Sequence, residues 1–238
     1  MVKNSKALAE REAAQRGEGK RKQDPAGRGS HGGYPDPPWL DVRLPTEAMN
    51  FLWDSINQST TRDATPGLAG NLTKSEFIQD KDNYFYDNVL LKFSEILYYE
   101  NWNNYYKVHI LKSIPPPLFE LKDLWVNYQK QHEFNPPHVH AGIYSFVVFM
   151  KIPTHWKEQH KLPMSANSRI PQASNFQFLM GQNLSSIKTT DFFLSPEDEG
   201  RMLFFPASLH HQVFPFYECE EDRVTISGNI FMKNLDED

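Results

Sequence analysis

The sequence predicts a mainly β fold with flanking helices on its N-terminal side. Apolar residues recur at helical spacing between residues 46 and 100, whereas beyond Asn104 the pattern becomes extended, with eight candidate strands in about 130 residues. Strands that follow one another without intervening helices are typical of an antiparallel sandwich or barrel. Eight of them suit a jelly roll, the cupin-like double-stranded β-helix.

The first 38 residues differ in composition from the rest of the chain. They carry eight Lys or Arg residues against four carboxylates before Asp36, and no Val, Ile or Phe after Val2. Such a segment cannot contribute to a core, so we expect residues 1–38 to be a disordered charged tail and linker. Because charges of both signs are mixed along it, a solvated tail is favoured over a nucleic-acid-binding arm.

Residues 39–238 are long enough for one folded domain with a substantial core, since 39% of the chain is hydrophobic. No run of about 18 apolar residues and no secretory signal is present, so we expect no membrane insertion and a cytoplasmic protein. The single Cys219 excludes an internal disulfide and a thiolate-clustered zinc site, which leaves His and carboxylate as metal ligands. The net charge of −5 makes nucleic acid an unlikely partner.

Two helices are predicted in a helical part over residues 45–104. The first spans Thr46 to Asn57, with Thr46 as the N-cap, and the second spans residues 84–100. Both have one apolar face, so we expect them to pack on the outside of a sheet. The residues of these faces are Met49, Leu52, Trp53 and Ile56 in the first helix and Phe85, Val89, Phe93, Ile96 and Leu97 in the second. Residues 60–73, rich in Thr, Gly and Pro, are predicted to form a loop.

The predicted jelly-roll core covers residues 105–232. Its candidate strands are 105–111, 124–129, 143–152, 175–180, 184–190, 201–206, 211–216 and 223–232. The connection 153–174 is too long for a hairpin turn, which favours a lid or a binding loop. We expect substrate contacts there, from Trp156, Lys157, His160, Lys161 and Arg169.

Residues 133–142, EFNPPHVHAG, place two histidines one residue apart after two prolines. On a strand, residues i and i+2 point to the same face, so His138 and His140 are able to hold one metal ion together. The prolines remove two backbone donors, as expected at the rim of a barrel. The alternatives are that only one histidine binds, or that both are exposed polar residues, because such a pair alone is a weak signal.

Two later segments strengthen the metal hypothesis. The strand before His210-His211 brings a third imidazole from a distant part of the sequence, and the strand beginning at Arg223 has one entirely polar face that includes Thr225. That face fits either a solvent-exposed edge or the wall of a polar cavity. If Phe216 pairs with Arg223 in a hairpin, His211 lies roughly 16 Å up the neighbouring strand. A small dicarboxylate would then fit between the metal and the guanidinium of Arg223, with Thr225 as a further donor.

These residues resemble the iron(II)- and 2-oxoglutarate-dependent oxygenases, specifically a prolyl-4-hydroxylase-like branch found in bacteria and marine phages. The family pattern N-P-x-H-x-H appears as Asn135 to His140 and is followed by Ser145. The pattern F-P-x-x-L-x-H-x-V-x-P-F appears as Phe205 to Phe216, and R-x-S/T-x-x-x-N appears as Arg223 to Asn229. The resemblance covers roughly residues 105–232 and extends to LAGN at 68–71. It implies a double-stranded β-helix and an enzyme that uses Fe(II), 2-oxoglutarate and O₂, hydroxylates a C–H bond and releases succinate and CO₂.

Carried over by position, the resemblance implies that His138 and His211 are iron ligands, that Arg223 binds the distal carboxylate of 2-oxoglutarate, and that Thr225 assists. The chain departs from most of the wider superfamily at His140, where an Asp or Glu is usual. Either His140 is the second ligand, so that three neutral imidazoles hold the iron, or His140 begins the motif and Gly142 occupies the carboxylate position. The second arrangement leaves room for a halide, as in halogenating relatives. We favour the first, because the His-x-His spacing already forms a chelate and imidazole suits iron.

The substrate is not determined by the sequence: a prolyl peptide or a small molecule would fit. Two rival functions remain. A non-catalytic jelly-roll binding module would explain the missing carboxylate, but it has no need to combine His138, His140 and His211 with Arg223. A three-histidine cupin enzyme that does not use 2-oxoglutarate would need the histidines without Arg223.

Overall fold

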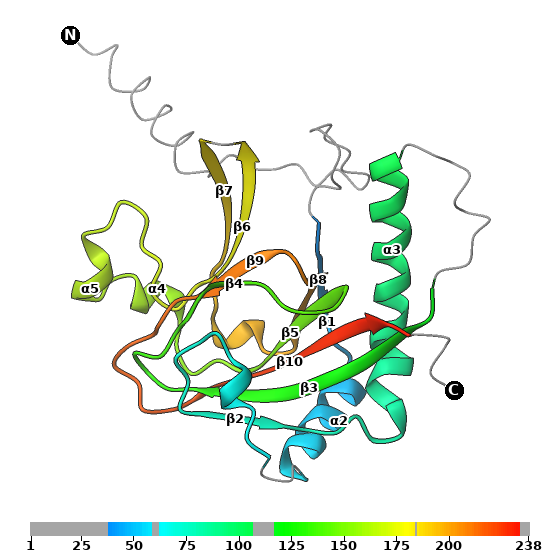
Figure 1. Ribbon diagram of the computed structural model, residues 1–238. Helices are drawn as coiled ribbons and strands as arrows, with labels where there is room; N and C mark the ends of the chain where they lie inside the picture. Colours follow the sequence, from blue (N-terminus) through cyan, green and yellow to red (C-terminus); the bar gives the residue numbers. More distant parts are fainter. Residues whose placement is uncertain (1–37, 59–61, 107–116, 184, 234–238) are drawn as a thin grey trace. The chain divides into compact units, whose positions relative to one another are not determined.

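The computed structural model describes residues 38–58, 62–106, 117–183 and 185–233, so that most of the predicted tail lies outside them (Figure 1). Within these residues the strands form two sheets, in which all neighbouring strands are antiparallel. The major sheet has the order β1-β8-β5-β10-β3-β2, and the minor sheet has the order β4-β9-β6-β7. The predicted jelly roll, a double-stranded β-helix, is therefore confirmed.

The strands of the major sheet are β1 (Leu40–Arg43), β2 (Lys74–Phe77), β3 (Phe119–Gln129), β5 (Tyr144–Lys151), β8 (Arg201–Pro206) and β10 (Arg223–Met232). Those of the minor sheet are β4 (Asn135–His138), β6 (Phe176–Asn183), β7 (Ser186–Phe192) and β9 (His210–Val213). The helices are α2 (Thr46–Asn57), α3 (Leu91–Tyr106), α4 (Trp156–Gln159) and α5 (Pro163–Ala166), and a π-helical turn (Tyr86–Leu90) leads into α3.

The helices α2 and α3 cover the outer face of the major sheet, as predicted (Figure 1). Leu52 of α2 and Leu97 of α3 are almost fully buried in one cluster with Phe146 and Val148 of β5. The apolar stripe of each helix is thereby removed from water, which is the main reason that these segments stay helical. The predicted N-cap was wrong: Thr46 is the first helical residue, and Pro45 occupies the cap position.

The predicted and the observed strands differ in several places. β3 begins at Phe119, five residues before the predicted start, and β6 extends to Asn183. Tyr105 and Tyr106, predicted to begin a strand, end helix α3, and residues 107–116 lie outside the described part of the chain. The strands β1, β2 and β4 were not predicted individually. Each has only four residues and lies at the edge of its sheet, so it carries too few alternating positions for a period-2 pattern to be visible. The strand predicted over 211–216 ends at Val213.

No helix of the described residues has the length and apolar character required to cross a lipid bilayer.

Candidate metal centre and cavity

His138 is the last residue of β4, an edge strand of the minor sheet. Pro136 and Pro137 fit there because an edge strand has unpaired backbone positions, and the register of β4 against β9 shifts between Asn135 and His138. The turn before β4 is fixed by buried Glu133, whose carboxylate accepts hydrogen bonds from the backbone N–H groups of Thr73 and Lys130, each at 2.9 Å. The chain thus presents His138 from a rigid approach.

His211 lies on β9 and is the direct cross-strand partner of His138. The centroids of the two imidazole rings are 4.2 Å apart. His211 is 4% exposed, and its ring packs among three aromatic rings, those of Phe176, Phe178 and Phe205. An aromatic wall of this kind excludes water and holds the imidazole in one orientation.

His140 lies two residues beyond the end of β4. Its backbone N–H donates to the carbonyl of Ala207 at 2.9 Å, which keeps the chain close to the turn after β8. Its ring faces Trp125 of β3, with ring centroids 5.8 Å apart. Both histidines of the His-x-His pair therefore turn toward the same place, although only the first belongs to a strand.

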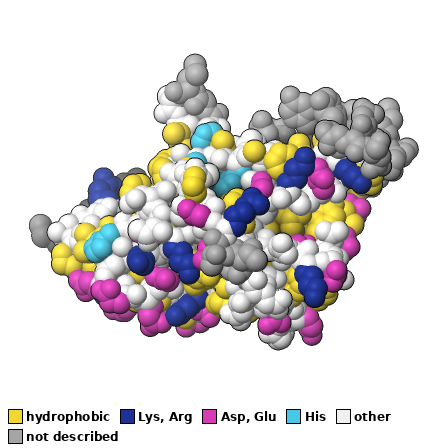
Figure 2. Space-filling view, turned by 60° about the horizontal axis from the view of Figure 1, so that its bottom comes forward, with side chains coloured by type: hydrophobic (Ala, Val, Ile, Leu, Met, Phe, Trp, Pro, Cys, Tyr) yellow, Lys and Arg dark blue, Asp and Glu magenta, His cyan; other side chains and the backbone are white. Residues whose placement is uncertain are grey.

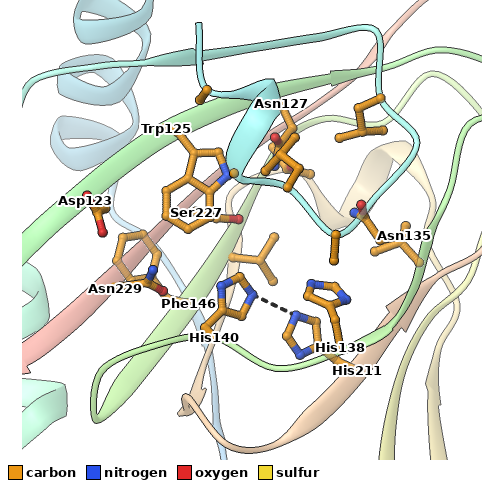
Figure 3. A pocket seen from close by; sticks show the side chains of 18 of the residues that line it. Asp123, Trp125, Asn127, Asn135, His138, His140, Phe146, His211, Ser227 and Asn229 are labelled. Atoms are coloured by element: carbon orange, nitrogen blue, oxygen red, sulfur yellow. Dashed lines mark hydrogen bonds between the residues drawn. The ribbon is translucent and has the colours of Figure 1, made fainter.

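The three imidazoles form a cluster that is able to hold a metal ion (Figure 3). One ligand nitrogen from each of His138, His140 and His211 lies within 4.8 Å of the others, and the Nε2 atoms of His140 and His211 are 3.1 Å apart. Two nitrogens that share an ion at about 2.1 Å and near-right-angle geometry are ~3 Å apart. No other such cluster of His, Cys, Asp or Glu is found among the described residues.

Backbone carbonyls fix the tautomers of two of the three histidines. Nδ1 of His138 lies 2.7 Å from the carbonyl oxygen of Pro136, and Nδ1 of His211 lies 3.0 Å from that of Leu209. A carbonyl only accepts, so each Nδ1 carries the hydrogen, and each Nε2 lone pair is left for an ion. A hydrogen bond at the outer nitrogen is the usual support of a metal-bound histidine.

Burial keeps the three imidazoles in the neutral form that metal binding requires. Desolvation lowers the pKa of His138, and it lowers the pKa of His140 to about 4, with a further contribution from neighbouring His138. Desolvation also brings the pKa of His211 well below its ordinary value. A neutral trio suits a first-row divalent ion, for which imidazole is a good ligand.

The cluster opens into a cavity of about 310 Å³ between the two sheets. This volume lies at the lower end of the range for small-molecule sites, about 300–1,000 Å³. The polar face of β10 lines this cavity, so of the two alternatives for that face, the wall of a polar cavity is correct and the solvent-exposed edge is not. Asn127 and Gln129 of β3 line it too. Leu68, Ala69 and Leu72 of the loop before β2 contribute apolar surface.

Arg223 closes one end of the cavity. It is 1% exposed, and desolvation lowers the pKa of its guanidinium to about 10. It donates to Ser174 and, at 3.4 Å, to Gln129, but its Nε has no hydrogen-bond partner. No carboxylate of the described residues pairs with it. A buried cation without a counter-ion is costly, and a carboxylate ligand would supply both the charge and the missing acceptor.

The predicted hairpin that joins the strand of His211 to that of Arg223 was wrong. β9 pairs with β4 and β6 in the minor sheet, whereas β10 pairs with β3 and β5 in the major sheet. His211 and Arg223 therefore approach the cavity from opposite sheets. Thr225 lies in the cavity wall two residues from Arg223. No local pattern in the sequence indicates this arrangement, because sheet membership depends on long-range pairing.

In the connection 153–174, none of the five residues predicted to contact substrate lines the cavity. These residues are Trp156, Lys157, His160, Lys161 and Arg169. It contains α4 and α5 and ends at Ser174, which has a positive φ of 71° and is fully buried. The backbone carbonyl of Ser174 accepts from Arg223 at 3.0 Å. Ser174 is a residue that sequence reasoning missed, since a single serine in a long connection has no distinguishing pattern.

His210, the neighbour of His211, and Gly142, the position considered in place of a carboxylate ligand, do not belong to the histidine cluster. His210 is exposed and is not part of the cluster. Gly142 has a φ of 93°, and a Cβ atom there would lie 2.6 Å from the carbonyl oxygen of Ile230. The positive φ and the close carbonyl explain why a glycine stands here, without a halide site. The alternative motif that begins at His140 leaves His138 out of the ligand set, whereas His138 lies in the cluster.

Histidine and hydrophobic side chains lie close together on the upper part of the face seen in Figure 2. The exposed hydrophobic residues that are nearest to the triad along the chain are Phe134, Val139 and Ile143. Apolar side chains beside a polar cavity are common in sites that bind organic molecules.

Comparison with known proteins gives a family match over the cavity-forming strands. Residues 123–229 match the model of a family described as putative 2OG-Fe(II) oxygenase. No curated protein matches the chain.

Several solved structures resemble the chain at low identity. The viral collagen prolyl hydroxylase of Paramecium Bursaria Chlorella virus-1 is 12% identical, with a TM-score of 0.47 and coverage of 81% of this chain and 95% of that one. A Pseudomonas putida prolyl-4-hydroxylase is 11% identical, with a TM-score of 0.45 and coverage of 83% and 94%. HygX from Streptomyces hygroscopicus is 10% identical, with a TM-score of 0.49 and coverage of 82% of each chain. At these values the substrates of those proteins say nothing about the substrate of this chain.

Proposed function

We propose that this chain is a 2OG-Fe(II) oxygenase and that His138, His140 and His211 hold its iron; the family match over residues 123–229 and the histidine cluster support this. The donor set fits the ion: three neutral imidazoles come from two strands and a turn, two of them with their tautomer fixed by the backbone. When bound, ferrous iron activates O₂ for oxidation of 2-oxoglutarate and of a substrate C–H bond. The products are succinate, CO₂ and the hydroxylated substrate.

The residues of the chain orient the reactants and keep water away. Arg223 would bind the distal carboxylate of 2-oxoglutarate, with Thr225 as an additional hydroxyl donor in the same wall. The aromatic rings around His211 shield that side of the centre from solvent. Because three imidazoles carry no charge, the iron keeps its full positive charge until the dianionic 2-oxoglutarate neutralises it, so we expect iron binding to depend strongly on 2-oxoglutarate.

The observation that carries the proposal is the joint presence of the triad and the buried, counter-ion-free Arg223 in one cavity. A three-histidine cupin enzyme without 2-oxoglutarate has no use for this arginine. A binding module has no use for three neutral histidines, two of them with fixed tautomers. The substrate in this proposal is a prolyl-type peptide or a small organic molecule. The proposed place of action is the bacterial or phage-infected cytoplasm, which the single Cys219 supports.

An anaerobic titration tests the proposal. Iron(II) and 2-oxoglutarate are added to the metal-free protein, and the visible charge-transfer absorbance of the iron–oxo-acid chelate is recorded. Oxygen is then admitted and succinate is measured. We expect an absorbance that requires both additions, disappears in His211→Ala and is retained in His210→Ala, the matched exposed neighbour. Absence of both absorbance and succinate in the unmodified protein would favour the binding module.

A further inference from the structure

The cavity continues past the metal centre on the side away from Arg223. Along the paired strands β10 and β3, Arg223 is opposite Gln129 and Asn229 is opposite Asp123. Gln129 and Asp123 are six residue steps apart on β3, a distance of roughly 20 Å. Trp125, whose ring faces His140, lies between them. His140 therefore contacts this ladder between its two ends, nearer to Asp123 than to Arg223.

Only two of the residues that line the described cavity carry a formal charge when the histidines are neutral. They are Arg223 and Asp123. Arg223 is accounted for by 2-oxoglutarate. Asp123 is half-buried, and no cationic side chain of the described residues forms an ion pair with it. Figure 3 shows it beside Trp125 and Asn229, at the far end of the cavity from His138.

A second, independent observation points to a ligand beside Trp125, on the side of its ring that faces Asn127 (Figure 3). The indole Nε1 of Trp125 is buried and has no hydrogen-bond partner, and the residue is only 7% exposed. Next to it, the side-chain oxygen of Asn229 accepts from the hydroxyl of Ser145 at 3.2 Å, which leaves the amide NH₂ group as a donor. A buried donor without an acceptor costs free energy, and a bound molecule with an acceptor would remove that cost.

The charges of the loaded site show which group lacks a partner. Three imidazoles add no charge. The ferrous ion, the guanidinium of Arg223 and dianionic 2-oxoglutarate sum to +1, and Asp123 brings the total to zero. Arg223 lies roughly 20 Å from Asp123 along the strands, too far to pair with it. Among the described lining residues Asp123 therefore has no cation next to it, and an ammonium group of a substrate would supply one.

We propose that this end of the cavity binds a substrate with a protonated amine, held by Asp123, and a hydrogen-bond acceptor that meets Nε1 of Trp125. The inference rests on the proposed function, because the substrate must lie next to an iron centre already loaded with 2-oxoglutarate. It narrows the substrate class to amine-bearing organic molecules, and it assigns Asp123 as the residue that distinguishes them from neutral molecules of the same shape.

Matched pairs of small probes test this assignment. Butylamine is compared with butanol, and benzylamine with benzyl alcohol, by ligand-observed NMR on the protein loaded with iron(II) and 2-oxoglutarate under argon. We expect each amine to bind about fivefold more tightly than its alcohol, the preference that one partly exposed ion pair provides. Asp123→Asn should abolish the preference. Glu120→Gln, a carboxylate on the same strand that pairs with Lys122 outside the cavity, should retain it.

The outcomes separate this inference from the proposed function. Equal binding of amines and alcohols, or no binding of either, overturns the amine assignment even when the iron(II)–2-oxoglutarate absorbance is intact. A preference that survives in Asp123→Asn, or that is lost equally in Glu120→Gln, also overturns it. Loss of the iron(II)–2-oxoglutarate absorbance in the unmodified protein would instead contradict the proposed function, and this inference with it.

Discussion

The Nε2 atoms of His140 and His211 lie 3.1 Å apart, with their ring planes within 8° of parallel. Because Nδ1 of His211 donates to a backbone carbonyl, Nε2 of neutral His211 carries no hydrogen, and His140 must be the donor of this pair in the metal-free protein. A cation between the two nitrogens takes the place of that hydrogen. His140 is thus the ligand that must change tautomer when the metal binds.

The first prediction concerns the ligand set. We expect His138→Ala and His140→Ala each to weaken iron(II) binding by about 100-fold or more, since even a residue that only supports a ligand is worth about 10- to 100-fold. Anaerobic calorimetry with iron(II) and saturating 2-oxoglutarate measures this. His210→Ala is the control and should bind iron normally. If His138→Ala left the affinity unchanged, the alternative motif of His140 with Gly142 would be correct.

The second prediction is a pH dependence of the metal-free protein. The folded pKa of His140 is lowered to about 4, so its neutral form stabilises the fold above the unfolded pKa, near 6.5, and this stability is lost as pH falls toward 4. His211, with its lowered pKa, acts in the same direction. We expect the free energy of unfolding to decrease between pH 6.5 and pH 4. Urea denaturation should show a smaller decrease in His140→Gln and an unchanged one in His210→Gln. An equal decrease in all three proteins would contradict the assignment.

The sequence predicted the strands of the jelly roll and the His-x-His pair because both are local patterns, whereas His211 was identified through the family resemblance. Alternation marks the long central strands, and His138 and His140 stand in a short motif. The opposite placement of His211 and Arg223 could not be predicted, since strand pairing is decided by contacts between residues far apart in the chain. Ser174 was missed for a related reason: its role depends on where a long connection ends in space.

The third prediction separates binding from stability at Arg223. We expect Arg223→Met to weaken 2-oxoglutarate binding by about 2 kcal/mol or more, because a charged hydrogen-bonded contact is lost. The free energy of unfolding should stay equal or rise, since an uncompensated buried cation is removed. Calorimetry with 2-oxoglutarate and urea denaturation measure the two effects.

Arg201 provides the contrasting arginine. Its guanidinium is already paired with Asp41 at 2.6 Å and with Asp198 at 3.0 Å. We therefore expect Arg201→Met to lose up to about 1 kcal/mol of stability and to bind 2-oxoglutarate with unchanged affinity. Normal 2-oxoglutarate binding by Arg223→Met would show that the anchor of the distal carboxylate lies elsewhere in the cavity.

The fourth prediction concerns the contact between the loop before β2 and the strand that carries His138. A Cβ atom at Gly70 would lie 1.5 Å from the side-chain oxygen of Asn135 and 3.1 Å from the carbonyl of Phe134, whereas a Cβ at Gly67 of the same loop would meet nothing within 4 Å. Gly70 therefore permits the close approach that also allows the backbone N–H of Asn71 to donate to Phe134 at 2.9 Å.

We expect Gly70→Ala to push this loop away from β4, to lower the free energy of unfolding by about 1–3 kcal/mol, and to weaken iron binding by about tenfold through displacement of His138. Gly67→Ala, the matched control, should change stability by less than about 0.5 kcal/mol and leave iron binding unchanged. Urea denaturation and anaerobic calorimetry on both variants measure these effects. A loss of stability in Gly70→Ala without any change in iron affinity would mean that the loop packs against β4 without positioning His138.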